Sequence, residues 1–431
     1  MGEEPIVRPP SIDALARSLA DTGLPHPLLV DAARTAVSNG DPAQARLLAD
    51  LTARQLLQPV INASGVLLHT NLGRARWPID AGDTPTNVEF DLIGGGRGDR
   101  QAATSLLLAR CTGAEAGLVV NNCAAAVLLV VTALAGGGSV AVSRGELVEI
   151  GGGFRIPDVM AQGGARLVEV GTTNKTRRDD YAAAHARHDL ELIMAIHRSN
   201  FTIEGFTASP TVAELATVGP PLAVDLGSGL LDTACPWLPG GPPTWLSREP
   251  AVRQTLDAGA DIVLFSGDKL LGGPQCGIIV GRADLISTCA RHPLMRALRC
   301  GAPTLGSLQH LLLTYLRRDG ASIPFWRQAT ARVEELQARA ETIVTVFGGP
   351  DAVLAIASTS TESVTGGGTL PDVTIDSWGV RIAGDVSTAL RTATPPIIAR
   401  MDGPNTLLDL RTVEPHEDRA LIDALRGIIR P

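Results

Sequence analysis

Short apolar runs alternate with longer amphipathic stretches from about residue 116 to residue 280. Short apolar runs are typical of buried strands, and apolar positions spaced three or four residues apart are typical of helices. The predicted strands span 116–120, 139–143, 166–170, 190–197, 222–225, 261–265 and 276–280, and the predicted helices span 124–134, 179–188, 211–218 and 250–258. Strands that alternate with helices predict an α/β fold with a large, mostly parallel sheet.

The regions before and after this pattern differ from it. Residues 1–58 carry amphipathic helical stretches, the first capped by Ser11, and predict a small helical N-terminal element. After residue 303 two helices, at 304–317 and 325–347, precede several short elements. We therefore predict a helical element over 1–58, a large α/β domain over 59–303 and a small α/β domain over 304–431.

Composition narrows the class of protein. The chain has 431 residues, and no apolar run approaches the ~18 residues that a membrane-spanning helix needs. Its start lacks the features of a signal peptide. The six cysteines form no C-x-x-C pair, which predicts reduced thiols in the cytoplasm. The net charge of −8 argues against a general affinity for nucleic acid, although arginines can still form a local basic surface, and we expect no DNA partner. No spacing of side chains indicates a metal site.

Lysine is rare in this chain. Only Lys175 and Lys269 occur among the 37 lysines and arginines. Lys269 lies in a turn of serine and glycines directly after the predicted strand 261–265. Lysine, unlike arginine, can lose its proton and form a Schiff base. We therefore interpret Lys269 as a covalent cofactor lysine; an ordinary turn lysine is the alternative.

Other polar residues also follow predicted strands, at the edge where sites in parallel sheets form. Asp225 ends one strand, and a carboxylate there would keep a pyridine nitrogen protonated. Together with Lys269 it predicts a site for pyridoxal phosphate (PLP). Asp225 alone is equally consistent with a turn residue. His197 and the segment 146–150 are both candidates for stacking on the cofactor ring.

A phosphate site is predicted beside this pair. The turn Asn121-Asn122-Cys123 joins a strand to the helix that begins near Ala124, and free N–H groups at a helix N-terminus bind anions. Ser266, three residues before Lys269, can bond the same phosphate.

Arginines provide candidates for a second anion site. Arg296 and Arg299 are three residues apart after a proline, so on a helix they would share one face and could bind an oxyanion. A salt-bridged surface is the alternative. Arg97 lies in a glycine-rich loop, where an anion site and a solvated loop are equally plausible. Arg400 and Arg411 are candidates for a ligand contact or an interface.

Four runs of residues resemble bacterial selenocysteine synthase, the L-seryl-tRNA(Sec) selenium transferase family. They are residues 62–75, 143–158, 169–176 and 265–275, the last reading FSGDKLLGGPQ. The similarity extends from about residue 10 to the C-terminus and is densest between 60 and 300. It implies the fold of PLP-dependent transferases related to aspartate aminotransferase. It also implies that seryl-tRNA(Sec) loses water to give an aminoacrylyl-tRNA, which accepts selenium from selenophosphate.

The resemblance also implies roles for individual residues. Lys269 matches the family's cofactor lysine, Asp225 the partner of the pyridine nitrogen, and Asp268 an acidic neighbour that takes part in the chemistry. Positions lining the selenium-donor pocket are matched by Arg74, Arg296 and Arg299. The family further implies a tRNA-binding N-terminal element and a homo-oligomer, a dimer or an assembly of dimers, with sites between subunits. The chain departs from the family pattern at Asp99, Cys123, Cys276 and 300–304.

Two other functions compete with this interpretation. A relative on the same scaffold could be a PLP-dependent lyase that eliminates from a free, phosphorylated amino acid or amino-sugar acid, with the arginines binding its phosphate. A protein that binds a cofactor or tRNA without catalysis is the third hypothesis, and the presence of both Lys269 and Asp225 argues against it.

Overall fold

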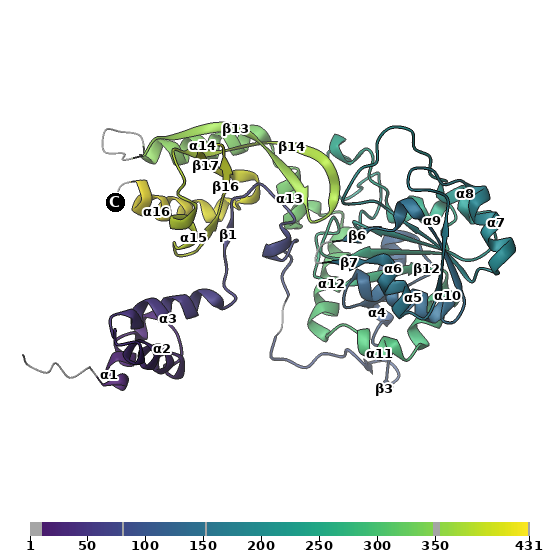
Figure 1. Ribbon diagram of the computed structural model, residues 1–431, viewed down its shortest axis with the longest axis horizontal. Helices are drawn as coiled ribbons and strands as arrows, with labels where there is room; N and C mark the ends of the chain where they lie inside the picture. The colour runs from purple at the N-terminus through teal and green to yellow at the C-terminus, as the bar shows by residue number, and fades with distance from the viewer. Residues whose placement is uncertain (1–10, 80–81, 151–152, 348–353, 430–431) are drawn as a thin grey trace, which may run out of the picture. The chain divides into compact units, whose positions relative to one another are not determined.

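The computed structural model describes residues 11–79, 82–150, 153–347 and 354–429 (Figure 1). The chain divides into two compact units, one of Met1–Ile61 with Thr394–Pro396 and one of Asn62–Ala393 with Ile397–Pro431. Residues 1–10 and 430–431, which belong to the predicted terminal domains, lie outside the described residues. In the described part, no helix is long and apolar enough to cross a membrane.

A seven-stranded sheet forms the centre of the larger unit, in the order β4-β12-β11-β10-β9-β5-β8. The neighbouring pairs β10–β11, β10–β9, β9–β5 and β5–β8 are parallel, whereas β12 is antiparallel to both β11 and β4. The fold class predicted from the alternating pattern is therefore confirmed. The strands are β4 (Ala116–Val120), β5 (Ser139–Ser143), β8 (Arg166–Val170), β9 (Leu192–Ile196), β10 (Leu222–Gly227), β11 (Ile262–Ser266) and β12 (Gly277–Gly281).

Helices cover both faces of this sheet, because side chains alternate between faces along each strand and most are apolar. Leu264 of β11 belongs to a core with α5 (Cys123–Ala135), α6 (Ile156–Gln162) and α10 (Ala283–Arg291). Its neighbour Phe265 points into the opposite core. Residues of that core come from the helices α4 (Ala102–Thr112), α7 (Arg178–His188), α8 (Val212–Ala216), α9 (Val252–Asp257) and α12 (Ala302–Leu316).

Several elements of the larger unit were not predicted. They are α4, α6, α10 and α11 (Leu294–Leu298), the short strands β2 (Phe90–Asp91), β3 (Gly96–Arg97), β6 (Glu149–Ile150) and β7 (Phe154–Arg155), and the 3₁₀ turns at Thr70–Leu72, Arg144–Glu146, Thr244–Leu246 and Gly320–Ser322. The short strand β1 (Ile61–Asn62), with one residue in each unit, was not predicted either, whereas α13 (Pro324–Ala329) lies within a longer predicted helix. The apolar positions of α4 lack a strong helical period, so its packing against β4 and α12 is visible only in the fold.

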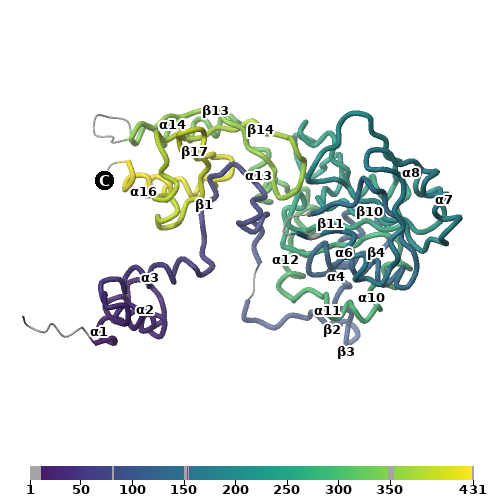
Figure 2. Tube along the Cα trace, in the orientation of Figure 1, coloured from purple at the N-terminus to yellow at the C-terminus, as the bar shows by residue number. Residues whose placement is uncertain are grey.

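The C-terminal part contains a four-stranded antiparallel sheet, in the order β13-β14-β17-β16. Its two long strands can be followed in Figure 2, and a loop of three glycines at 366–368 joins them. The elements are β13 (Ile356–Gly366), β14 (Thr369–Ile382), β15 (Ile397–Ile398), β16 (Arg400–Asp402) and β17 (Asn405–Asp409), with the helices α14 (Val333–Phe347), α15 (Ser387–Arg391) and α16 (Asp418–Ile429) and the 3₁₀ turns at Leu410–Thr412 and Pro415–Glu417.

The prediction of one helix over 325–347 is wrong, because α13 and α14 are separate. Arg411 is buried where α13 ends, and its Nη1 donates to the carbonyls of Gln328 at 2.8 Å and Ala331 at 3.0 Å. These bonds satisfy carbonyls that the end of a helix leaves free. Arg400 likewise bonds Ser64 O at 2.7 Å and Asp409 at 3.2 Å. Both arginines therefore hold the fold together within the chain.

The smaller unit contains the helices α1 (Ile12–Arg17), α2 (His26–Ser38) and α3 (Gln44–Gln55) and a 3₁₀ turn at Ala20–Thr22. The predicted cap is confirmed, since Ser11 accepts the N–H of Ala14 at 3.1 Å. Small side chains such as Ala33 and Ala36 form much of its core and let the helices approach closely.

Replacing Gly277 with alanine is expected to destabilise the fold at the edge of the site. A Cβ there would overlap the carbonyl of Asn122 and lie 2.9 Å from Cys123 N, so β12 and the start of α5 would have to separate. We expect a loss of about 1–3 kcal/mol, the usual cost of overpacking. Gly427→Ala in α16 is the control, since nothing lies within 4 Å of its Cβ. Equal thermal unfolding midpoints for the two variants would contradict this account.

Candidate functional site

A cavity of about 220 Å³ lies at the carboxyl ends of β9, β10 and β11, beside the N-terminus of α5. Sites in open parallel sheets form at this edge. Most of the residues predicted for the site line this one cavity: Arg74, Asn122, Cys123, Ala124, His197, Asp225, Ser266, Asp268 and Lys269. The topology thus brings together residues that are up to 195 positions apart in sequence.

Asp225 and Lys269 are both buried, each with 5% of its surface exposed. A Cβ added to Gly227 would lie 3.7 Å from Lys269 Nζ and 3.9 Å from Asp225 Oδ1, so both groups border the same space. Burial raises the pKa of Asp225, and the positive charge of Lys269 opposes that rise. Two buried groups of opposite charge that border the same open space are suited to a ligand that interacts with both charges.

Cys123 contacts this pair directly. Its Sγ donates to Asp225 Oδ1 at 3.5 Å. Burial, together with the negative charge of Asp225, raises the pKa of the Cys123 thiol well above its usual value. The side chain at this departure from the family pattern is therefore a thiol that donates to the site carboxylate.

The start of α5 provides a site for an anion. Asn122 caps the helix, because its Oδ1 accepts the N–H of Ala125 at 2.9 Å. The other N–H groups of the first turn have no partner within the helix, and the helix dipole is positive there. Ser266 and Ala124 line the same cavity, as an anion site at this turn requires. Asn121 does not line it: its N–H donates to Leu298 O at 3.0 Å.

Asp268 is held by Arg74. Arg74 Nη1 donates to Asp268 Oδ2 at 2.9 Å, and Asp268 has only 5% of its side chain exposed. Arg74 has a left-handed backbone with φ of 58°, which is uncommon for a residue other than glycine. Its Nε is buried without a hydrogen-bond partner. The guanidinium therefore pairs with the carboxylate on one side and keeps further donor capacity for a ligand.

His197 enters the cavity from the end of β9, where its N–H donates to Asp225 O at 2.8 Å. Its Nε2 lies 3.7 Å from Oε2 of Glu249, a buried residue that sequence reasoning missed. Glu249 stands in a loop before Pro250, and nothing in the sequence pattern marked it. Glu146, from the other stacking candidate, accepts the N–H of Ile196 at 3.0 Å.

The remaining arginines occupy a separate pocket of about 420 Å³ within the chain, lined by Arg97, Arg296 and Arg299. Arg299 follows the end of α11 with an extended backbone, so the predicted shared helical face is wrong, although both side chains line the pocket. Glu89, which sequence reasoning also missed, lies 3.2 Å from Arg299 Nη1 and 3.0 Å from Arg100 Nη1. The bond from Arg100, helped by these positive charges, lowers the pKa of Glu89.

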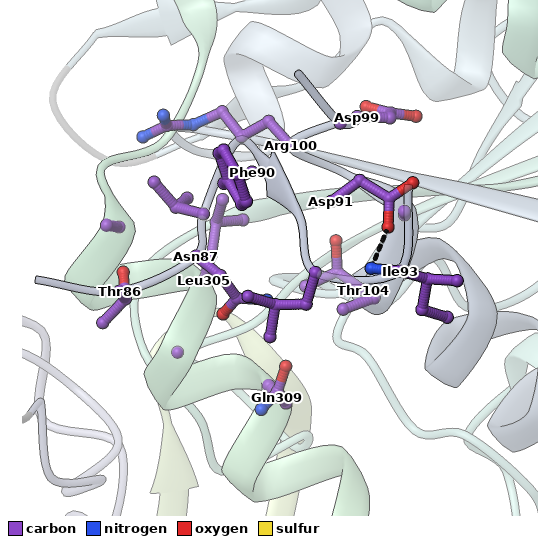
Figure 3. A pocket seen from close by; sticks show the side chains of 17 residues that line it. Thr86, Asn87, Phe90, Asp91, Ile93, Asp99, Arg100, Thr104, Leu305 and Gln309 are labelled. Carbon is purple, nitrogen blue, oxygen red and sulfur yellow. Dashed lines mark hydrogen bonds between the residues drawn. The ribbon is translucent and has the colours of Figure 1, made fainter. Parts of the chain in front are cut away.

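A larger hollow of about 740 Å³ lies beside the β2–β3 hairpin (Figure 3). Phe90 and Asp91 border it on one side and Leu305 and Gln309 of α12 on another. Asp91 Oδ1 accepts the N–H of Ile93 at 2.9 Å and shapes the turn. The hollow contains no group of the Lys269 cavity. Among the described residues, no cluster of His, Cys, Asp and Glu could hold a metal ion.

Comparison with known proteins decides the family. The sequence profile of the L-seryl-tRNA selenium transferase family matches residues 60–414. The chain belongs to this family. The resemblance predicted from the four motifs is confirmed, and the chain is an enzyme of the transferase class. The L-seryl-tRNA(Sec) selenium transferase of Moorella thermoacetica is 44% identical over 403 residues, which cover 87% of this chain and 83% of the relative. The one from Geobacter sulfurreducens is 41% identical over 458 residues, with 96% of each chain covered.

A solved structure supports the fold. D-glucosaminate-6-phosphate ammonia-lyase superposes with a TM-score of 0.57 at 22% identity, over 86% of this chain and 96% of that chain. At this identity the likeness establishes the shared architecture of a selenium transferase family member and a lyase. The fold by itself therefore does not separate the two enzyme hypotheses.

Glu146→Gln is expected to change how stability depends on pH. Burial raises the pKa of Glu146 from 4.5 to about 7, against the bond from Ile196 N–H. A carboxyl that binds its proton more tightly when folded contributes stability below pH 4.5 and loses it as pH rises to about 7. Glutamine keeps the hydrogen-bond acceptor for the N–H of Ile196 but does not titrate. The variant should gain on the order of 2 kcal/mol over the wild type between pH 5 and 8. If the unfolding midpoints of the variant and the wild type differ by the same amount at every pH from 5 to 8, the raised pKa of Glu146 would be contradicted.

Proposed function

We propose that this chain converts L-seryl-tRNA(Sec) to L-selenocysteinyl-tRNA(Sec), with PLP as cofactor and selenophosphate as selenium donor. The reaction would pass through the aminoacrylyl ester that remains on the tRNA after water is lost. The observation that supports this most is the convergence of Asp225, Lys269, Ser266 and the α5 N-terminus on one cavity in a member of this family.

The residues of the cavity fit PLP in charge and position. Asp225 would bind the ring nitrogen, while Ser266 and the N–H groups at Cys123 and Ala124 would bind the phosphate. When bound, PLP withdraws electrons from the substrate's Cα and so makes its proton removable. Lys269, the only lysine at the cavity, would hold the cofactor and then move the proton from Cα.

Asp268 and Arg74 are proposed to act on the reacting side chain. Asp268 is buried beside Lys269 and bonded to Arg74, so it can hold a proton near the hydroxyl that leaves as water. Arg74 has donor capacity left over, including the unpartnered Nε, for an anionic selenium donor. It is the one arginine of the proposed donor set that lines the Lys269 cavity.

Arg296 and Arg299, with Arg97, would bind the multiply charged selenophosphate as an oxyanion. They line a pocket apart from Lys269 within the chain. We propose that a second subunit brings such a pocket to the cavity in a homo-oligomer, a dimer or an assembly of dimers. Apolar side chains of the β2–β3 hairpin support self-association, since Ile93 is 100% and Leu92 73% exposed.

The proposed parts of the chain have separate tasks. Residues 1–58 are proposed to bind tRNA, 59–303 to bind the cofactor and 304–431 to form the small domain. Because the net charge is −8, recognition would rely on RNA shape more than on bulk charge. We propose a cytoplasmic location, where this tRNA is charged, and no DNA partner.

The alternative is a PLP-dependent lyase that acts on a free phosphorylated amino acid or amino-sugar acid. This alternative is supported by the fold that the chain shares with D-glucosaminate-6-phosphate ammonia-lyase. The relatives at 40–44% identity named as selenium transferases favour the transferase.

Single-turnover transfer tests the proposed function. Purified protein is mixed with seryl-tRNA(Sec) and selenophosphate, and the aminoacyl group is then released and identified. We expect selenocysteine from the wild type and none from Lys269→Ala. If serine remains and the protein instead eliminates ammonia from a phosphorylated amino-sugar acid, the lyase is the correct assignment.

Arg296→Ala and Arg299→Ala are each expected to raise the KM for selenophosphate about tenfold or more, because a charged hydrogen-bond donor is lost. Loss of water from seryl-tRNA(Sec) without the donor should be unchanged. Arg419→Ala is the control, since this arginine is 94% exposed on α16. An unchanged KM for both variants would exclude this pocket as the donor site.

A further inference from the structure

Glu249 is a buried carboxylate that the proposed chemistry does not use. Only 4% of the residue is exposed, and its Oε1 is buried without any hydrogen-bond partner. Burying a charged group without full compensation is costly, so such residues persist where a nearby group needs them. Glu249 lies in the loop between β10 and α9, and its own N–H is satisfied by Leu246 O at 2.9 Å.

The one charge partner of Glu249 in the described structure is His197, whose Nε2 lies 3.7 Å from Glu249 Oε2. His197 has 26% of its side chain exposed and lines the Lys269 cavity, whereas the carboxylate behind it has 2%. The imidazole therefore stands between the cavity and a buried carboxyl group. A residue behind a site group in this way fixes its orientation.

The backbone of His197 is tied to the cofactor-binding strand. Ile196 pairs with Asp225 across β9 and β10, and the next N–H, of His197, donates to Asp225 O at 2.8 Å. These backbone contacts fix the position of the main chain at His197. They do not fix the side-chain torsions that orient the imidazole. Glu146, which accepts the N–H of Ile196, lies at the same strand end, in the 3₁₀ turn that follows β5.

We propose that Glu249 is a positioning residue of the cofactor site, which holds the imidazole of His197 against the bound cofactor. The proposal rests on the proposed function, because it requires PLP in the Lys269 cavity. Glu249 itself touches neither cofactor nor substrate and acts through His197. The same contact would choose His197 over the 146–150 segment as the group that lies against the cofactor ring.

The test measures cofactor retention in the full chain. PLP is loaded, free cofactor is removed, and the dissociation rate is followed by the absorbance of the bound form. Glu249→Gln keeps the shape and removes the charge, so we expect PLP to leave about tenfold faster, with a shifted absorbance maximum. His197→Ala should show the same effect, and the double variant should be no worse than His197→Ala alone.

Glu414→Gln is the matched control. Glu414 is also buried, but it pairs with Arg327 at 2.9 Å in the small domain. This variant should lose thermal stability and keep the wild-type PLP dissociation rate. If Glu249→Gln does not fold, His197→Gln tests the pair from the other side and should release PLP faster.

These outcomes distinguish failure of the positioning role of Glu249 from failure of the proposed function. If the Glu249→Gln variant folds and releases PLP at the wild-type rate, the positioning role is overturned. The proposed function is unaffected by that result. If the effects of Glu249→Gln and His197→Ala on the PLP dissociation rate are fully additive, the positioning role is overturned as well. A wild-type protein that binds no PLP at Lys269 would overturn both.

Discussion

Two opposite charges buried in one cavity, Asp225 and Lys269, are the constraint on which the site depends. Removing both from water is costly, and the attraction between opposite charges offsets that cost only when their geometry is fixed. The fold fixes it through adjacent parallel strands, since Asp225 pairs in register with Leu264 of β11. Both charges then emerge at the same sheet edge, facing the positive end of α5. Cys123, Ser266 and His197 complete the lining because α5 begins, and β11 and β9 end, at that edge.

The arrangement of the sheet was predictable because local pattern and packing agree there. Apolar runs buried on both faces gave the strands of the large sheet, and a strand end followed by a polar turn gave the cavity residues. Features set by distant contacts were not predictable. The end of α13 at Ala329 is bonded by Arg411, which is 82 positions away. Glu249 and Glu89 carry no local pattern at all, and their importance appears only once His197 and the arginines lie beside them.

The division of the proposed site has a consequence for assembly. One chain provides the Lys269 cavity with Arg74, whereas Arg97, Arg296 and Arg299 line another pocket together with Glu89. Glu89 pairs with Arg100 and Arg299 and neutralises part of that positive charge. We propose that association of subunits completes the selenium site, in keeping with the sites between subunits that the family resemblance implies. Departures such as Cys123 alter the contacts of Asp225 while keeping a donor at its carboxylate.

The central claim is that Lys269 carries the cofactor, and the rarity of lysine makes it directly testable. The chain contains only Lys175 and Lys269, so borohydride reduction of the PLP-loaded protein, followed by peptide mass mapping, has two lysines to distinguish. The account predicts a pyridoxyl group on the peptide that contains Lys269 and an unmodified Lys175. A label on Lys175 alone, or no label on either lysine in a protein that retains PLP, would contradict it.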